Sequence, residues 1–196
     1  PVLRSDLPAE GVRFGAGQWR RLWGAVEVDE GVPAGNYPVT VRFLDPETGS
    51  SLVAITQRIT VYGVTLPRQT LRRTEWFHSD CLAQYYGTGV FSERHWEIME
   101  RFITVAVKRG CNMILTPHIT PALDTARGME RETVQLVEIR RENGTYSFDF
   151  ARLERWVRMC QKAGMRDFER AHLFPQWGAP PAPQIMADGD GGPERV

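Results

Sequence analysis

Phe91-Ser-Glu-Arg-His-Trp96 begins a helical pattern that ends at Gly110, and His118 follows eight residues after that glycine. Phe148-Asp-Phe-Ala-Arg-Leu153 begins a second helical pattern that ends at Gly164, and His172 follows eight residues after it. A short apolar segment separates glycine from histidine in both copies. In each copy a helix ends at a glycine, and a strand follows that ends near a polar residue. This order is typical of a β/α barrel or a doubly wound sheet, whose active site lies at the carboxyl ends of the strands.

The equal spacing predicts that His118 and His172 point the same way. Side chains alternate along a strand, so equal offsets place two residues on the same face when the strands start in equivalent register. The remaining pattern extends this unit in both directions. We expect strands at residues 74–78, 112–116 and 168–174, parallel in one sheet, with both helices on its outer face.

The start and end of each helix have recognisable signals. Ser92 is a good N-cap for the first helix, and Asp149 for the second. Gly110 and Gly164 are typical helix stops. Between the second strand and the second helix, Asn143-Gly144 separates two apolar runs, which is a strong hairpin signal. The proline-rich segment from Pro175 to the end of the chain is expected to be a loop.

Residues 1–71 have a different, β-rich pattern. Apolar runs at residues 22–28, 36–44 and 52–62 predict three or four strands, and Asp45-Pro-Glu-Thr-Gly49 is a turn sequence. A complete seven-stranded β-sandwich uses roughly 100 residues, so this segment is expected to be the C-terminal part of one. Residues 66–71 read as the linker that leaves it.

Composition excludes several classes of function. Lysine plus arginine and aspartate plus glutamate each number 24, so the net charge is zero and nothing favours nucleic acid as a partner. No apolar run is long enough for a membrane span. Three widely spaced cysteines fit neither a disulfide framework nor a zinc motif. No glycine-rich nucleotide loop occurs, and no cofactor is expected.

The chain starts at Pro1 without a signal peptide, so a cytoplasmic and a secreted location both stay open. We expect a piece of a longer protein.

Side chains that suit a sugar gather at the predicted strand ends. Trp76-Phe-His-Ser-Asp80 offers an indole, an imidazole and a carboxylate, and aromatic faces stack on the apolar faces of sugar rings. The plain alternative is that these tryptophans belong to the core and the histidines tie down loops. Three histidines and an aspartate could also hold a metal, but the His-x-His pair of metal-dependent barrel hydrolases is missing. The predicted substrate-binding residues are Trp76, His78, Asp80, His118, His172, Gln176 and Trp177.

Carboxylates near the predicted strand ends do not form an acid/base couple. None of them is followed by a second acidic residue, whereas a glycosidase needs an acid and a second carboxylate near the bond that is cut. Glu169 differs from His172 in strand parity and is expected to face away from the rim. The carboxylates in question are Glu75, Asp80, Asp124 and Glu169.

Several long strings resemble glycoside hydrolase family 123 and its bacterial relatives. They are Glu75-Trp-Phe-His-Ser-Asp-Cys-Leu-Ala-Gln-Tyr-Tyr86, Phe91-Ser-Glu-Arg-His-Trp-Glu97, Asn112-Met-Ile-Leu-Thr-Pro117, His172-Leu-Phe174 and Gln176-Trp-Gly178. The resemblance implies an α/β fold in which a β-sandwich precedes a (β/α)8 TIM-type barrel. Residues 1–71 would be the end of the sandwich with its linker, and residues 72–196 the first three β/α units of the catalytic barrel.

The resemblance also implies an activity. Characterised members of the family are exo-acting, retaining β-N-acetylgalactosaminidases in which the acetamido oxygen of the substrate attacks the anomeric carbon. An Asp-Glu pair assists: the aspartate orients the acetamido group and the glutamate is the general acid. No segment here matches that pair, which is expected beyond Val196, so no catalytic residue is assigned and the fragment is expected to be inactive alone. The partner implied is a glycan. The alternatives are a non-catalytic carbohydrate-binding or scaffold protein of the same fold and a metal-dependent barrel hydrolase.

Overall fold

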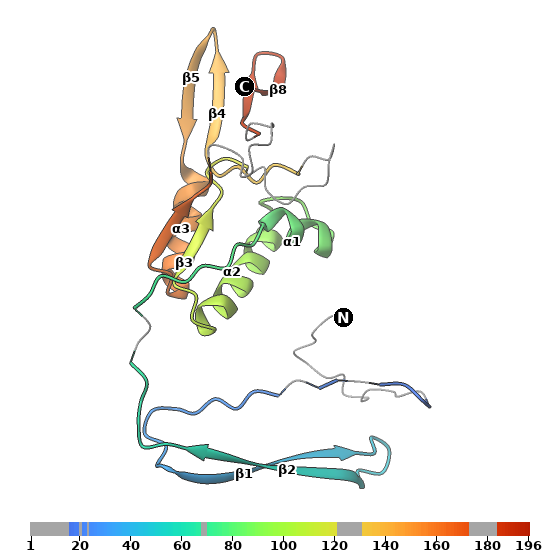
Figure 1. Cartoon of the computed structure of the whole chain (residues 1–196). Coiled ribbons are helices and arrows are strands. Elements are labelled where there is room, and N and C mark those ends of the chain that lie inside the picture. Colours follow the sequence, from blue (N-terminus) through green and yellow to red (C-terminus); the bar gives the residue numbers. More distant parts are fainter. Residues whose placement is uncertain (1–15, 20, 23, 68–69, 121–130, 173–183) are drawn as a thin grey trace. The chain divides into compact units, whose positions relative to one another are not determined.

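The computed structural model describes residues 16–19, 21–22, 24–67, 70–120, 131–172 and 184–196. The chain divides into two compact units, Pro1–Arg68 and Gln69–Val196. Figure 1 shows the elements of both units in the colours of the sequence. None of the helices in the described part combines the length and apolar character needed to cross a bilayer.

The first unit contains an antiparallel hairpin. Strand β1 (Gly35–Leu44) pairs with β2 (Ser51–Val61). The turn between them is held by Asp45, whose Oδ1 accepts hydrogen bonds from the backbone N–H groups of Glu47 and Thr48 at 2.9 and 3.0 Å. The predicted turn is therefore confirmed.

The expected strand at residues 22–28 is wrong. The described residues of this segment form no strand, and Leu22 and Val28 are about half exposed. A strand needs a neighbour for its backbone hydrogen bonds, and no described segment pairs with this one. The apolar residues of the hairpin, such as Val41 and Ile55, are similarly exposed, so the described residues of this unit form one layer and not two.

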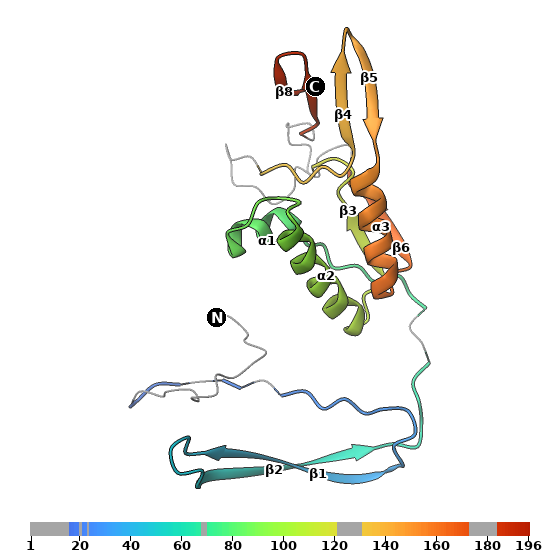
Figure 2. The same cartoon turned by 180° about the vertical axis from the view of Figure 1, so that it is seen from behind.

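The second unit is a mixed α/β domain with two open sheets, and its described residues form no closed barrel. Figure 2 shows the same elements from behind. In chain order they are α1 (Ser79–Tyr86), α2 (Glu93–Lys108), β3 (Met113–Thr116), β4 (Glu138–Glu142), β5 (Thr145–Asp149), α3 (Ala151–Ala163), β6 (Asp167–Arg170), β7 (Met186–Gly189) and β8 (Gly192–Arg195).

Strands β3 and β6 are parallel, as predicted, and lie side by side (Figure 1). Every residue of β3 pairs with the residue 54 positions later, from Met113 with Asp167 to Thr116 with Arg170. The same interval separates Gly110 from Gly164 and His118 from His172. The interval of the sequence repeat is thus the same as the interval between paired residues of the two parallel strands.

The first of the three predicted strands, at residues 74–78, is present only as one parallel bridge between Thr74 and Met113. The chain leaves the sheet early because α1, which the sequence did not predict, begins at Ser79. The side chain of Asn112 holds the entry segment in place: its Nδ2 donates to the carbonyl of Leu71 at 2.7 Å, and its Oδ1 accepts from the N–H of Arg73 at 2.8 Å.

The predicted caps of α2 are confirmed. Ser92 Oγ accepts a hydrogen bond from the N–H of His95 at 3.2 Å, and Gly110 has a φ of 90°. At the end of α3, Gly164 has a φ of 107°, and a Cβ there would lie 3.1 Å from Cγ1 of Val107. Glycine is required at this position both for its backbone conformation and because the neighbouring segment is close.

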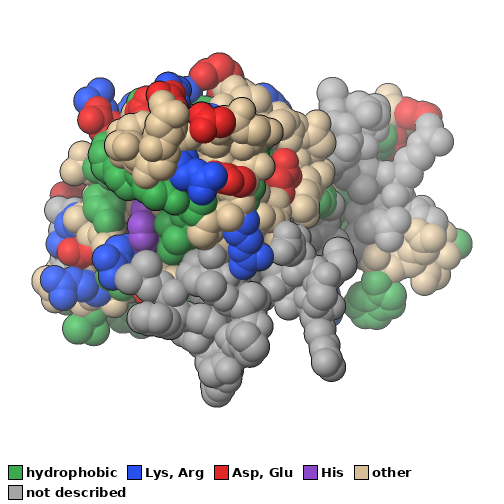
Figure 3. Space-filling model, turned by 90° about the horizontal axis from the view of Figure 1, so that it is seen from above, with side chains coloured by type: hydrophobic (Ala, Val, Ile, Leu, Met, Phe, Trp, Pro, Cys, Tyr) green, Lys and Arg blue, Asp and Glu red, His purple; other side chains and the backbone are tan. Residues whose placement is uncertain are grey.

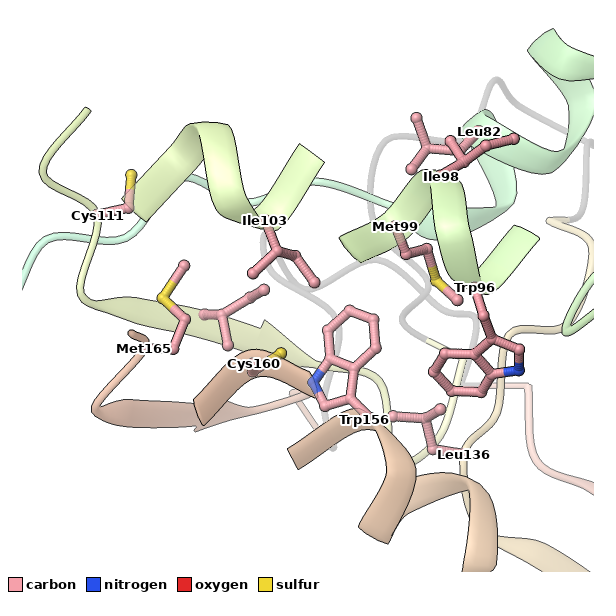
Figure 4. Close-up of a cluster of buried hydrophobic side chains, with 11 residues drawn as sticks. Leu82, Trp96, Ile98, Met99, Ile103, Cys111, Leu136, Trp156, Cys160 and Met165 are labelled. Carbon is pink, nitrogen blue, oxygen red and sulfur yellow. The ribbon is translucent and has the colours of Figure 1, made fainter. Parts of the chain in front are cut away.

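A core of buried apolar side chains joins both helices to one face of the parallel pair (Figure 4). Ile103 of α2 and Trp156 of α3 are almost completely buried, as is Ile114 of β3. Phe77 stacks against Trp156 with a centroid distance of 6.3 Å. Full burial of one such aliphatic side chain is worth roughly 1.5 to 3 kcal/mol. The other buried members of the cluster are Leu82, Trp96, Ile98, Met99, Cys111, Leu136, Cys160 and Met165.

The second sheet has the order β5-β4-β7-β8, and β4 and β5 extend beyond the carboxyl ends of β3 and β6 (Figures 1 and 2). The predicted hairpin is confirmed, since Asn143 and Gly144 both have positive φ values, 48° and 77°. The predicted terminal loop is wrong for the last residues, where β7 and β8 form a hairpin. Gln135 attaches β7 by donating to the carbonyl of Met186 and accepting from its N–H.

Candidate functional site

Three side chains are in contact beside the carboxyl ends of the parallel strands, and we call them the rim cluster: Trp76, Glu169 and His172. The indole Nε1 of Trp76 donates a hydrogen bond to Glu169 Oε2 at 2.8 Å. His172 Nε2 lies 3.5 Å from Glu169 Oε1. The rings of Trp76 and His172 meet edge to face, with centroids 5.0 Å apart. One carboxylate thus contacts both rings and fixes them relative to each other.

The register of the strands explains why these side chains meet. Thr74 pairs with Met113, and Met113 with Asp167. Two residues further along the paired strands stand Leu115 and Glu169, which share a face of the sheet. Phe168, of opposite parity, packs against the helical core. The hydrogen bond from Trp76 to Glu169 therefore places the rim cluster on the side of the sheet away from that core.

The prediction that Glu169 faces away from His172 is wrong. It assumed an extended strand from residue 168 to 174, but β6 ends at Arg170. Alternation of side chains applies only within the strand, so His172 is free to turn back toward Glu169. The sequence does carry one signal for Glu169: the 54-residue repeat aligns it with the apolar Leu115, so a carboxylate stands where the first copy has a leucine.

The rim cluster is partly exposed and chemically mixed. Trp76 is 37% exposed, and the side chains of His172 and Glu169 are 30% and 24% exposed. An indole offers an apolar face, while a carboxylate offers several acceptor positions and an imidazole offers one or two donors. A polyhydroxylated ring with one apolar face matches this combination.

His118 occupies the position equivalent to His172, two residues past the end of β3. Its side chain is partly buried, and its Nδ1 is buried without a hydrogen-bond partner among the described residues. Burial is the main cause that lowers the pKa of His118; the Arg170 charge lowers it further, and the Thr116 carbonyl partly opposes the shift. The imidazole is therefore neutral at pH 7. Figure 3, seen from above, shows one histidine between hydrophobic side chains on the surface.

Asp80 was expected to contact substrate, but the structure places it in a buried ion pair. Nη1 of Arg131 donates to both carboxylate oxygens, at 3.0 and 2.9 Å. The side chains of Arg131 and Asp80 are only 9% and 4% exposed. Asp80 lies in the first turn of α1, so the pair fixes the segment before β4 to the start of that helix. The carboxylate of Asp80 is thus paired with a cation and almost completely buried.

The other predicted residues are less informative. His78 is the N-cap residue of α1 and is partly buried. Asp124, Gln176 and Trp177 lie outside the described residues. Within the described ranges, no group of three or more His, Cys, Asp or Glu side chains is arranged to hold a metal ion.

Comparison with known proteins places the chain in a family. The model of the glycoside hydrolase 123 catalytic domain matches residues 76–195. Among solved structures, the chain is similar to a family 123 glycoside hydrolase from Clostridium perfringens, studied for glycolipid glycan hydrolysis, with a TM-score of 0.64 and 16% identity. The similarity covers 87% of this chain but only 31% of that one. No curated protein sequence matches the chain.

Proposed function

The chain belongs to glycoside hydrolase family 123, and on this premise we propose that it is part of a glycosidase whose sugar subsite includes the rim cluster. The observation that carries the proposal is the shared carboxylate of Glu169, which contacts both Trp76 and His172 on the side of the sheet away from the helical core. Carboxyl ends of parallel strands are where barrel enzymes bind their substrates.

The fold proposed for the longer protein is a β-sandwich followed by a (β/α)8 barrel. Residues 1–71 would form the end of the sandwich and the linker, and residues 72–196 the first three β/α units. Support comes from the parallel pair β3 and β6, from two helices on one face of it, and from the share of the similar structure that the chain covers, 31%.

The reaction proposed for the longer protein is retaining, substrate-assisted hydrolysis of a terminal β-N-acetylgalactosaminide in a glycan. The acetamido oxygen of the sugar forms a bond to the anomeric carbon while the glycosidic bond breaks, and the leaving oxygen takes a proton from a glutamic acid. An aspartate orients the acetamido group. We propose that this pair lies outside residues 1–196, and that residues 1–196 hold and orient the ring.

Within that scheme the described side chains have separate roles. The indole of Trp76 packs against the apolar face of the sugar, and His172 and the neutral His118 exchange hydrogen bonds with its hydroxyls. His78 is proposed as a further contact, as are Gln176 and Trp177, which lie outside the described residues. Asp80 acts through Arg131, by fixing the segment before β4 to α1.

Two assays on purified residues 1–196 test this proposal. Calorimetric titration with methyl β-N-acetylgalactosaminide is expected to show weak binding that Trp76→Ala abolishes. Turnover of an aryl β-N-acetylgalactosaminide is expected to be absent. Trp19→Ala is the matched control, because Trp19 is 91% exposed and lies in the other unit.

The outcomes are separable. Failure of the wild-type chain to bind the sugar would refute the subsite. Robust turnover by residues 1–196 would show that the acid lies within this chain. Hydrolysis by the longer protein distinguishes an enzyme from a carbohydrate-binding protein of the same fold, which would bind the sugar but leave it intact.

A further inference from the structure

We propose that Glu169 determines the specificity of the rim cluster: it selects a neutral sugar ring by accepting hydrogen bonds from its hydroxyls, and it disfavours rings that carry sulfate or carboxylate groups. This inference rests on the proposed function, because it concerns the ligand of the same subsite. The sequence alone had placed Glu169 away from the rim.

The carboxylate of Glu169 retains unused hydrogen-bonding capacity. It has about four lone-pair positions. Oε2 accepts from Trp76 Nε1 and Oε1 lies, at a longer distance, near His172 Nε2, so these contacts use one position on each oxygen. The side chain is 24% exposed, so the remaining positions are open to a ligand. A carboxylate only accepts, so the groups it can bind are donors such as sugar hydroxyls.

The position of Glu169 relative to Trp76 determines which part of the ligand the carboxylate contacts. Trp76 Nε1 points at the carboxylate, so Glu169 lies at the edge of the indole and not over its face. A ring that stacks on the exposed part of the indole therefore presents its rim of hydroxyls toward the carboxylate. Equatorial hydroxyls leave a sugar ring at that rim, whereas axial C–H groups occupy its faces.

The same position penalises an anionic ring. A sulfate or carboxylate that replaces the hydroxyl beside Glu169 brings two negative charges together and removes the donor, and like charges in contact are a common means of rejecting wrong ligands. Among the described residues, the basic side chain that contacts Glu169 is His172, and the distance between them is long, at 3.5 Å.

The test compares wild-type residues 1–196 with Glu169→Gln. Glutamine keeps the shape, and its oxygen still accepts from Trp76 Nε1, so the indole stays in place. The probes are N-acetylgalactosamine and its 4-sulfate and 6-sulfate, titrated by calorimetry. The wild type is expected to bind the neutral sugar about tenfold more tightly than at least one of the sulfates. Glu169→Gln is expected to bind the neutral sugar about fivefold more weakly, and the ratio of its affinities for the neutral and the sulfated sugar should be smaller than that of the wild type.

Glu97→Gln is the control, because Glu97 is an exposed carboxylate on α2 that pairs with Arg94 of the same helix. If Glu169 merely positions Trp76, Glu169→Gln will bind all three sugars as the wild type does, and the inference is overturned while the subsite stands. Equal wild-type affinity for the neutral sugar and both sulfates also overturns it. If the wild type binds none of the sugars, the proposed function fails, and this inference fails with it.

Discussion

The indole N–H of Trp76 donates to the carboxylate of Glu169 at 2.8 Å, although 93 positions of sequence separate the two residues. Three helices, a strand and a hairpin intervene. The register of Thr74, Met113 and Asp167 brings the two segments together, and the hydrogen bond forms just beyond the bridge at Thr74. The hydrogen bond therefore depends both on the fold of the unit and on the local geometry of the candidate site.

The buried Asp80–Arg131 pair predicts a large effect of removing one partner. Arg131→Met would leave a carboxylate without its cation where both side chains are at most 9% exposed. We expect the free energy of unfolding to fall by about 3 kcal/mol, measured by urea denaturation followed by circular dichroism.

The control for this change is Arg94→Met, because Arg94 and Glu97 form an ion pair in which both side chains are more than half exposed. Its expected effect is within about 1 kcal/mol. If Arg131→Met were as mild as Arg94→Met, the buried pair would not stabilise the unit. Combining Arg131→Met with Asp80→Leu should recover part of the loss, because no unpaired charge then remains.

The three cysteines are expected to differ in reactivity. Cys81 is exposed, whereas Cys111 and Cys160 are buried, and burial raises the pKa of the Cys160 thiol to about 12. Thiolate is the reactive form, so a disulfide reagent at pH 8 should modify one thiol rapidly and the other two only after unfolding. Cys81→Ser should remove the rapid phase. Rapid modification of Cys160 in the folded chain would contradict the core in Figure 4.

His118 predicts a dependence of stability on pH. Burial lowers the pKa of this imidazole from its ordinary value of about 6.5. The unfolded chain then binds the proton first, so the stability that neutral His118 contributes is present above that value and is lost as pH falls through the folded pKa. His118→Gln should reduce the fall in unfolding free energy between pH 8 and 5, and the ring protons of His118 should titrate below pH 6.5 by NMR. A folded pKa above 6.5 would contradict the burial.

Much of the second unit follows from local sequence signals. Ser92 caps α2, Gly110 and Gly164 end the helices, and Asn143-Gly144 makes the hairpin turn, because each depends on the conformation of a few adjacent residues. The parallel pair follows from the repeat itself. Helix α1 was missed because it is only 8 residues long and has no side-chain cap. Strands β7 and β8 were missed because their glycine, proline and charged residues are typical of a loop.

The site was harder to predict, because its contacts join distant segments. Trp76 and His172 were chosen for their places at strand ends and do meet. Glu169 was rejected because its parity was counted along a strand that ends sooner than expected. Asp80 was assigned to the ligand because nothing in the sequence marks Arg131, 51 positions away, as its partner.

The central claim is that the rim cluster binds a sugar, and the indole N–H signal of Trp76 tests it most directly. The signal is assigned in a ¹⁵N-labelled chain as the indole peak missing from Trp76→Phe, and N-acetylgalactosamine is then titrated. The account predicts a progressive, saturable shift of this peak, while that of Trp156, which is 1% exposed, stays in place. A Trp76 peak that does not move at saturating sugar, or that moves no more than the Trp156 peak, would contradict the account.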